Sequence, residues 1–271
     1  MSDFDRNAAT AHFGRPLTRA ETAVVDEGLR AYMLRIYNYM VLGLAITGFA
    51  ALGIYMLSTV TDAGSAARNA VGAAVALKSG LYLTPVGYAL FVSPLKWAVI
   101  LAPLALVFFL SFRIQNMRPA TAQITFWIYA ALVGVSLGSI FLVYTHTSIV
   151  RVFFITAASF GALSLWGYTT QRDLTGMGSF LLMGLFGIII ASLVNVFVAS
   201  TMLQWTISVI GVLVFAGLTA YDTQRLKAEY MYGAMDGDVM ERSAIMGALS
   251  LYLDFLNLFT MLLSLLGGRE E

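Results

Sequence analysis

The chain has 271 residues, of which 59% are hydrophobic and 11% charged, and its mean hydropathy is +0.80. In a soluble domain about a quarter of the residues are charged, so this composition indicates a membrane protein. The net charge of +1 gives no basic field for nucleic acid. The absence of cysteine excludes disulfides and thiol catalysis, and two histidines do not favour a zinc site, so we expect no cofactor.

Residues 1–30 are polar and mixed in charge, and we expect a cytosolic tail with no signal peptide. The predicted transmembrane domain covers residues 31–268. It contains seven apolar segments, each near or above the roughly 17–25 residues that cross a bilayer as a helix. These segments are 36–57, 95–112, 123–144, 149–168, 179–200, a sixth from about 205, and 244–266.

The connection 58–94 holds an ambiguous apolar stretch, 71–92, interrupted by Lys78, Gly80 and Pro85. Lys and Arg are enriched in cytosolic loops, so their distribution tests whether this stretch is an eighth span. With seven spans and the N-terminus inside, 11 of the 16 Lys and Arg residues are cytosolic, whereas an eighth span would leave eight inside and seven outside. We therefore predict seven spans, with 58–94 as an extracytoplasmic or interfacial connection.

The last span carries a carboxylate at its middle, Asp254. An ionisable residue within a span is costly and is a functional-site hypothesis by default. The polar and small residues of this span recur at steps of three, four or seven and share one helix face: Ser243, Gly247, Ser250, Asp254, Asn257 and Ser264. The serines and glycine alone are also typical of a packing seam, as are Gly134, Gly138, Gly184 and Gly187 in earlier spans.

A second carboxylate, Asp222, lies near the end of the sixth span. In an antiparallel helical hairpin, residues equally far from the turn lie level. The midpoint between positions 222 and 254 falls at 238, beside Gly233 and Gly237, which favour a turn. The sequence therefore permits a facing pair with Asp254. The alternative for Asp222 is a helix-end carboxylate bridged to Arg225, one turn further on.

Two carboxylates in a dry interior cannot both ionise cheaply, so a pair tends to share one proton. Such a pair suits a proton-sensitive latch, a hard-cation site or acid–base hydrolysis. Arg113, at the cytosolic end of the second span, is a cation that could act on the pair. Equally, it could be an interface arginine that follows the positive-inside rule.

The run Phe-Ala-Gly-Leu-Thr-Ala-Tyr-Asp-Thr-Gln at 215–224 closely resembles the signature of the Bax inhibitor-1 family in its bacterial branch. Arg-Ala-Tyr at 30–32, Gly-Val-Ser-Leu-Gly at 134–138 and Leu-Trp-Gly-Tyr-Thr-Thr-Gln-Arg-Asp-Leu at 165–174 add to the resemblance. It implies a seven-helix bundle of the bacterial inner membrane with the last helix at its centre, surrounded by the other six. It also implies a pH-sensitive calcium leak governed by two aspartates, which Asp222 and Asp254 match, and a latching arginine on the second helix, for which Arg113 is the best match.

Three functions follow as hypotheses. The first is a leak for Ca²⁺ or other cations, with ion transit at Asp222 and Asp254 beside the polar stripe of Ser250 and Asn257. The second is a non-transporting regulator that binds a membrane protease or another stress-response complex through its tail. The third is an intramembrane aspartyl protease, but Leu-Tyr-Leu precedes Asp254 where such enzymes need Gly-x-Gly, and no proline follows Pro119. We therefore predict that the protein is not an enzyme.

Overall fold

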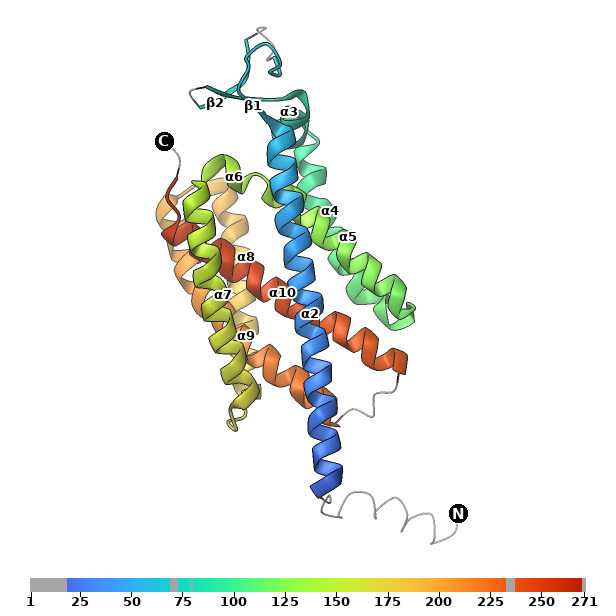
Figure 1. Cartoon of the computed structure of the whole chain (residues 1–271). Helices are drawn as coiled ribbons and strands as arrows, with labels where there is room; N and C mark the ends of the chain where they lie inside the picture. The colour runs from blue at the N-terminus through green and yellow to red at the C-terminus, as the bar shows by residue number, and fades with distance from the viewer. Residues whose placement is uncertain (1–18, 69–72, 79, 233–236, 270–271) are drawn as a thin grey trace.

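The computed structural model describes residues 19–68, 73–78, 80–232 and 237–269. In this part of the chain, seven long helices form a bundle (Figure 1). They are α2 (Arg19–Ser58), α4 (Lys96–Arg113), α5 (Pro119–Leu137), α7 (His146–Thr169), α8 (Thr175–Val198), α9 (Thr201–Tyr232) and α10 (Gly237–Leu266). Each is long and apolar enough to cross a membrane. The prediction of an all-α membrane protein with seven spans is confirmed.

Helix boundaries follow local sequence signals. Pro119 stands at the first turn of α5, where its missing N–H costs nothing, and Arg118 before it is extended. Thr145 caps α7 by accepting a hydrogen bond from the backbone N–H of Ser148. The predicted third span is divided, because α5 ends at Leu137 and a short helix, α6 (Ile140–Val143), follows it. The expected tail is helical from Arg19 onward, and residues 1–18 lie outside the described part of the chain.

The connection between α2 and α4 forms a small antiparallel sheet and a short helix. The strands β1 (Thr59–Val60), β2 (Ala76–Lys78) and β3 (Leu81–Leu83) are arranged in the order β1-β3-β2, followed by α3 (Pro85–Phe91). Gly80 turns the chain between β2 and β3 with a φ of 77°. The described residues of the ambiguous stretch therefore form no membrane-spanning helix, while residues 71, 72 and 79 fall outside the description.

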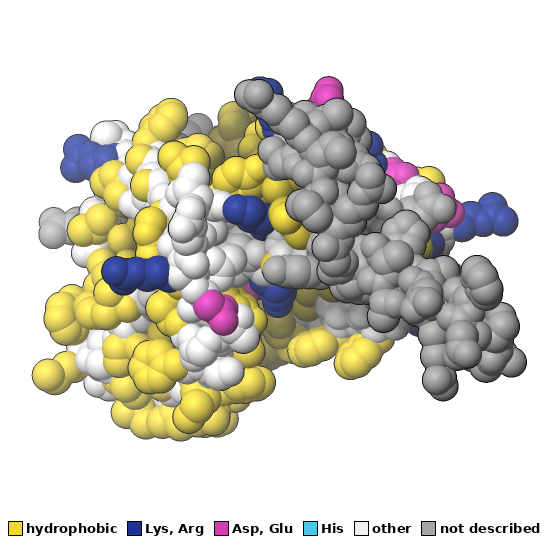
Figure 2. All heavy atoms as spheres, turned by 90° about the horizontal axis from the view of Figure 1, so that it is seen from below, with side chains coloured by type: hydrophobic (Ala, Val, Ile, Leu, Met, Phe, Trp, Pro, Cys, Tyr) yellow, Lys and Arg dark blue, Asp and Glu magenta, His cyan; other side chains and the backbone are white. Residues whose placement is uncertain are grey.

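The bundle has two ends, which we name by their contents. The tail end is where α2 begins, and the sheet end carries the three strands (Figure 1). Dark blue Lys and Arg side chains are visible across the tail end in Figure 2. The assignment of the tail end to the cytosol stays a prediction.

Helix α10 lies at the centre of the bundle. It packs against α2, α5, α7 and α9. Of the residues in its most apolar stretch, 44% are buried, against 11% in the corresponding stretches of α4 and of α8. Helix α4 packs mainly on α5, and α8 mainly on α9, so these two form the outer walls. The expectation of a central last helix is confirmed, although it is in extensive contact with the four inner helices rather than equally with all six.

Small residues allow the closest helix approaches. A Cβ added to Gly134 of α5 would lie 2.5 Å from the carbonyl oxygen of Thr47 on α2, and one added to Gly138 would lie 2.3 Å from Ile54. Gly184 faces Val214 at 2.9 Å in the same way. The predicted seams are confirmed at these positions and wrong at Gly187, where an added Cβ meets nothing within 4 Å.

Candidate functional site

The two aspartates come from adjacent antiparallel helices, α9 and α10, which pack along each other. Asp222 is 8% exposed and Asp254 is 5% exposed. Asp254 lies within electrostatic reach of Asp222, as it also does of Arg225. The structure therefore brings together the two carboxylates that the hairpin argument placed level, and Gly233 of the expected turn lies outside the described residues.

Asp254 occupies a dry part of the bundle. Its neighbours along α10, Leu251, Tyr252, Phe255 and Leu258, are all buried. Within the described part of the chain, the Oδ2 atom of Asp254 has no hydrogen-bond partner although it is buried. A buried carboxylate oxygen without a partner is expected to bind a proton, a water molecule or a cation, because an unpaired buried charge is strongly destabilising.

Asp222 has a cation one helical turn away. The Nη1 atom of Arg225 lies 3.4 Å from Oδ1 of Asp222, which is the bridge that the sequence offered as the alternative role for Asp222. Arg225 also donates from Nη2 to the hydroxyl of Ser250 on α10, at 3.3 Å. The two interpretations of Asp222 are thus compatible, since it pairs with Arg225 and also lies within electrostatic reach of Asp254.

Arg225 separates two polar cavities. One, of about 290 Å³, lies between α9, α10 and the short 3-10 helix η1 (Ile114–Asn116), and Glu229, Arg242 and Ser250 are among its lining residues. The other, of about 520 Å³, is lined by Tyr221 and Gln224 of α9 and by residues 171–173 and 175. Arg225 lines both cavities and is the ion-pair partner of Asp222, whereas neither aspartate is among the described residues that line them.

Arg113 is placed differently. It is the last residue of α4 and is exposed, and among the described residues neither aspartate forms an ion pair with it. Its neighbours Ile114 and Gln115 line the smaller polar cavity, so the end of α4 lies close to the site without Arg113 reaching it. The latch role of Arg113 stays a prediction, and the cation next to the pair is Arg225.

The polar stripe of α10 faces α9. Three of its serines form hydrogen bonds with α9 side chains: Ser243 with Glu229 at 2.8 Å, Ser250 with Arg225 at 3.3 Å, and Ser264 with Ser208 at 3.0 Å. Asn257 instead donates to the carbonyl oxygen of Leu253 in its own helix, at 2.8 Å. The stripe is therefore a packing seam along most of its length, with Asp254 at the middle of the seam.

Sequence reasoning missed a chain of hydroxyls that reaches the site from the side. The Tyr37 hydroxyl of α2 lies 2.5 Å from Oγ of Ser164 on α7, which lies 2.8 Å from Oγ1 of Thr223 on α9. Thr223 follows Asp222 directly and is fully buried. The signal available in the sequence was a set of isolated hydroxyl residues within apolar spans, which do not by themselves reveal their partners.

Metal-ligating side chains do not cluster in the described part of the chain. Within the described ranges, no group of three or more His, Cys, Asp or Glu side chains could hold a metal ion. A Ca²⁺ ion takes six to eight oxygen ligands, and the site offers two carboxylates with the hydroxyl of Ser250 nearby. This donor set falls short of the oxygen ligands that a tight Ca²⁺ site needs.

Residues 29–271 match the family described as "Inhibitor of apoptosis-promoting Bax1". An uncharacterized protein of Rickettsia prowazekii (strain Madrid E) is 44% identical over 256 residues, which are 94% of this chain and 96% of the relative. A Caulobacter vibrioides protein is 44% identical over 271 residues, the full length of both chains. The inner membrane protein YbhL of Escherichia coli (strain K12) is 42% identical over 244 residues, 90% of this chain and 94% of the relative.

These matches cover the whole helical bundle and confirm the resemblance drawn from the run at 215–224. The seven apolar helices are consistent with these relatives, because the Escherichia coli protein, which is of similar length, is itself named as an inner membrane protein. This chain is therefore an integral, multi-pass membrane protein that belongs to the Bax inhibitor-1 family, in its bacterial branch.

Proposed function

We propose that this protein is a pH-sensitive leak for Ca²⁺ or other cations in the bacterial inner membrane, gated by a proton shared between Asp222 and Asp254. The observation that carries the proposal is the buried carboxylate pair on the two packed helices α9 and α10, with Arg225, the ion-pair partner of Asp222, lining two polar cavities. The inner membrane location draws on the name of the Escherichia coli relative.

Gating would follow from the charge of the pair. When one proton is shared, Arg225 balances the remaining charge and also holds α10 through Ser250. When that proton leaves, the second negative charge attracts a cation to the unpartnered oxygen of Asp254, in competition with Arg225. Two carboxylates bind Ca²⁺ too weakly to retain it, which suits permeation.

The arrangement described here corresponds to a closed state in this proposal. From Asp254 towards the sheet end, the fully buried side chains of α10 are apolar, including Phe255, Leu258 and Leu263. Opening therefore requires α10 to shift against its neighbours. Arg225 holds the closed arrangement, and Arg113 would act as a latch only after the end of α4 moved towards the pair.

The test is Ca²⁺ flux into liposomes that contain the purified protein and a calcium-sensitive dye, measured across pH. The wild type is expected to leak with a clear pH dependence, and the Asp254→Asn variant with little or none. Asp62→Asn is the control, because Asp62 is an exposed acid at the sheet end, bonded to Gly64 and Ser65. An Asp254→Asn protein that leaks with the wild-type pH profile would end the proposal.

A second candidate function is a non-transporting regulator that binds a membrane protease or stress-response complex. The observation in its favour is the length of α2, whose 40 residues span about 60 Å, twice the roughly 30 Å of a bilayer core. The first turns of α2 extend beyond the bundle at the tail end (Figure 1). Capture of a stoichiometric partner through residues 19–30, together with no flux after reconstitution, would favour this function. We propose no enzymatic activity for either case.

A further inference from the structure

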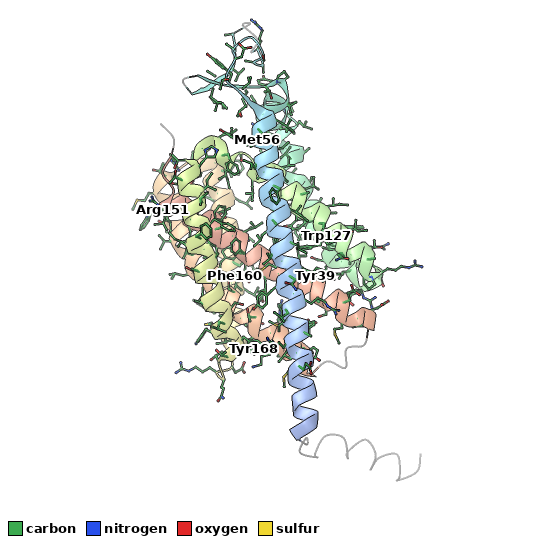
Figure 3. The ribbon with its side chains drawn as sticks, viewed as in Figure 1. Tyr39, Met56, Trp127, Arg151, Phe160 and Tyr168 are labelled. Carbon is green, nitrogen blue, oxygen red and sulfur yellow. The ribbon has the colours of Figure 1, made fainter. Side chains whose placement is uncertain are left out.

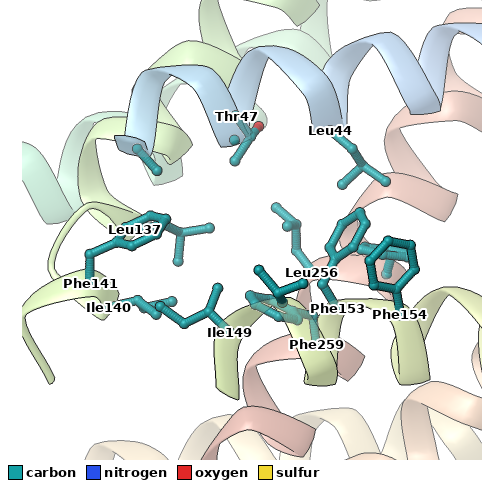
Figure 4. A pocket seen from close by; sticks show the side chains of 14 residues that line it. Leu44, Thr47, Leu137, Ile140, Phe141, Ile149, Phe153, Phe154, Leu256 and Phe259 are labelled. Carbon is teal, nitrogen blue, oxygen red and sulfur yellow. The ribbon is translucent and has the colours of Figure 1, made fainter. Parts of the chain in front are cut away.

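A lateral cleft runs between α2 and α7, which both pack on α10 without packing closely on each other. Its tail-end half is a cavity of about 730 Å³ between residues 30–40 of α2 and 160–168 of α7. Its sheet-end half is a cavity of about 260 Å³ between residues 44–51 and 149–154, with Phe255 and Phe259 of α10 also lining it (Figure 4). The two cavities follow each other along the same antiparallel helix pair.

The dimensions of the cleft match a lipid leaflet. Residues 30–40 of α2 rise about 15 Å along the helix, which is half the roughly 30 Å of a bilayer core. The walls here are Met33, Leu34, Phe160 and Leu165, and in Figure 3 the side chains of Phe160 and Tyr168 lie between α7 and α2. A Cβ added to Gly161 would meet nothing within 4 Å, so the cleft is open at this point.

The charge at the tail end of the cleft has one sign. Arg30 is the charged residue among its described lining residues, and it is exposed. Tyr168 lines the same cavity, and its carbonyl oxygen accepts a hydrogen bond from Lys227 at 2.9 Å, with the Lys227 amine 5.0 Å from the Tyr168 ring centre. Lys227 is thus a second cation beside the cleft, behind the residues that line it. A cationic rim above an apolar, leaflet-deep groove is complementary to an anionic lipid.

We propose that this cleft binds an anionic phospholipid of the surrounding bilayer. Its phosphate lies at Arg30 and Lys227, and one acyl chain follows the wall at Phe160 and Gly161 towards the sheet end. An apolar protein helix matches the cleft less well, because it would bring no negative charge to Arg30.

The bound lipid would lie next to the aspartate pair. The Phe160 ring packs 5.5 Å from that of Phe255, the residue after Asp254. Tyr37 and Ser164 line the cleft, and their hydroxyls connect through hydrogen bonds to Thr223, the residue after Asp222. The binding site itself does not depend on whether the chain conducts calcium.

The test uses protein reconstituted with equal amounts of phosphatidylglycerol and phosphatidylcholine, extracted gently and analysed by native mass spectrometry. The wild type is expected to retain one phosphatidylglycerol per chain. Gly161→Leu fills the cleft and is expected to retain no more of it than of phosphatidylcholine. Gly187→Leu is the matched control, because Gly187 on α8 is equally open but distant in the fold, and it is expected to behave as the wild type.

The headgroup is tested separately. Arg30→Gln is expected to reduce the preference for phosphatidylglycerol about fivefold, since one basic residue at a membrane surface contributes about that factor. Arg118→Gln, an exposed arginine at the start of α5, is expected to leave the preference unchanged. Both leucine variants replace a helix-interior glycine and are expected to fold, which circular dichroism checks.

Three outcomes would overturn the proposal: a wild type that retains no phosphatidylglycerol, a Gly161→Leu protein that retains as much as the wild type, or equal loss in Gly161→Leu and Gly187→Leu. A dimer mass that disappears in Gly161→Leu would also overturn it, because a second copy of the chain would then be the occupant.

Discussion

The Nη2 atom of Arg225 lies 3.3 Å from the hydroxyl of Ser250, so the cation that pairs with Asp222 on α9 is also held by α10. One side chain therefore connects the two helices that carry the buried carboxylates. Lysine could not make both contacts in the same way, because only the guanidinium presents several donors in a fixed plane.

The first prediction is that Arg225→Gln opens the leak. The substitution removes the cation from both aspartates and its bond to Ser250, a loss of about 1 kcal/mol that corresponds to about a fivefold shift from closed to open. Calcium flux at neutral pH in liposomes is expected to rise by that factor, with a smaller rise in Arg225→Lys. Arg118→Gln serves as the control. An unchanged flux in Arg225→Gln would show that Arg225 does not hold the closed state, and a rise in Arg113→Gln instead would return the latch to Arg113.

The second prediction concerns the cost of the buried acid. Asp254 leaves Oδ2 without a partner among the described residues, so Asp254→Leu is expected to stabilise the fold by about 1–3 kcal/mol. Asp222→Leu also removes the ion pair with Arg225, so its expected gain in stability is smaller. The measurement is the thermal unfolding midpoint of the purified proteins in one detergent. A lower midpoint for Asp254→Leu would mean that the carboxylate supports the fold rather than a function.

Hydropathy was sufficient to predict the seven spans, because each helix needs an apolar surface along its length. That Asp222 and Asp254 lie on adjacent antiparallel helices was predictable too, since α9 and α10 are consecutive and few residues separate their ends. The position of Arg113 relative to the pair was not. It depends on how α4 is rotated and how far it reaches, and a single sequence does not fix either.

Other features were beyond sequence reasoning for similar reasons. The strands between 59 and 83 have two or three residues each, too few for an alternating pattern to be recognised. Gly134 and Gly187 have the same sequence character, but one meets the backbone of α2 and the other faces open space. The Tyr37–Ser164–Thr223 contacts join three helices whose relative register only the fold defines.

The third prediction uses two glycines as a matched pair. A Cβ added to Gly167 of α7 would lie 2.3 Å from the carbonyl oxygen of Ala220 on α9, and backbone atoms cannot move aside cheaply. Gly167→Ala is expected to destabilise the protein by about 1–3 kcal/mol. Gly187→Ala adds a methyl group in open space within a helix and is expected to stabilise it by about 0.5–1 kcal/mol. Thermal midpoints that move in the same direction for both variants would contradict the close α7–α9 crossing.

The fourth prediction tests how the central helix is tied to α2. The Tyr252 hydroxyl on α10 lies 2.6 Å from Oγ1 of Thr47, and both residues are buried. Tyr252→Phe leaves Thr47 with its bonds to the carbonyl oxygens of Gly43 and Ala130, so the expected loss of stability is about 1 kcal/mol.

Thr47→Val has a larger expected effect, because it leaves the Tyr252 hydroxyl without a hydrogen-bond partner in a dry interior. The expected loss of stability is about 1–3 kcal/mol. Thr206→Val is the control, since Thr206 bonds only its own helix at Met202 among the described contacts. The double variant Thr47→Val with Tyr252→Phe is expected to lose less than the sum of the two single variants, because removing both partners leaves no orphan hydroxyl. Simple additivity of the thermal midpoints would show that these two hydroxyls do not bond, which would leave Tyr32–Ser243 and Tyr39–Glu241 as the described polar contacts between α2 and α10.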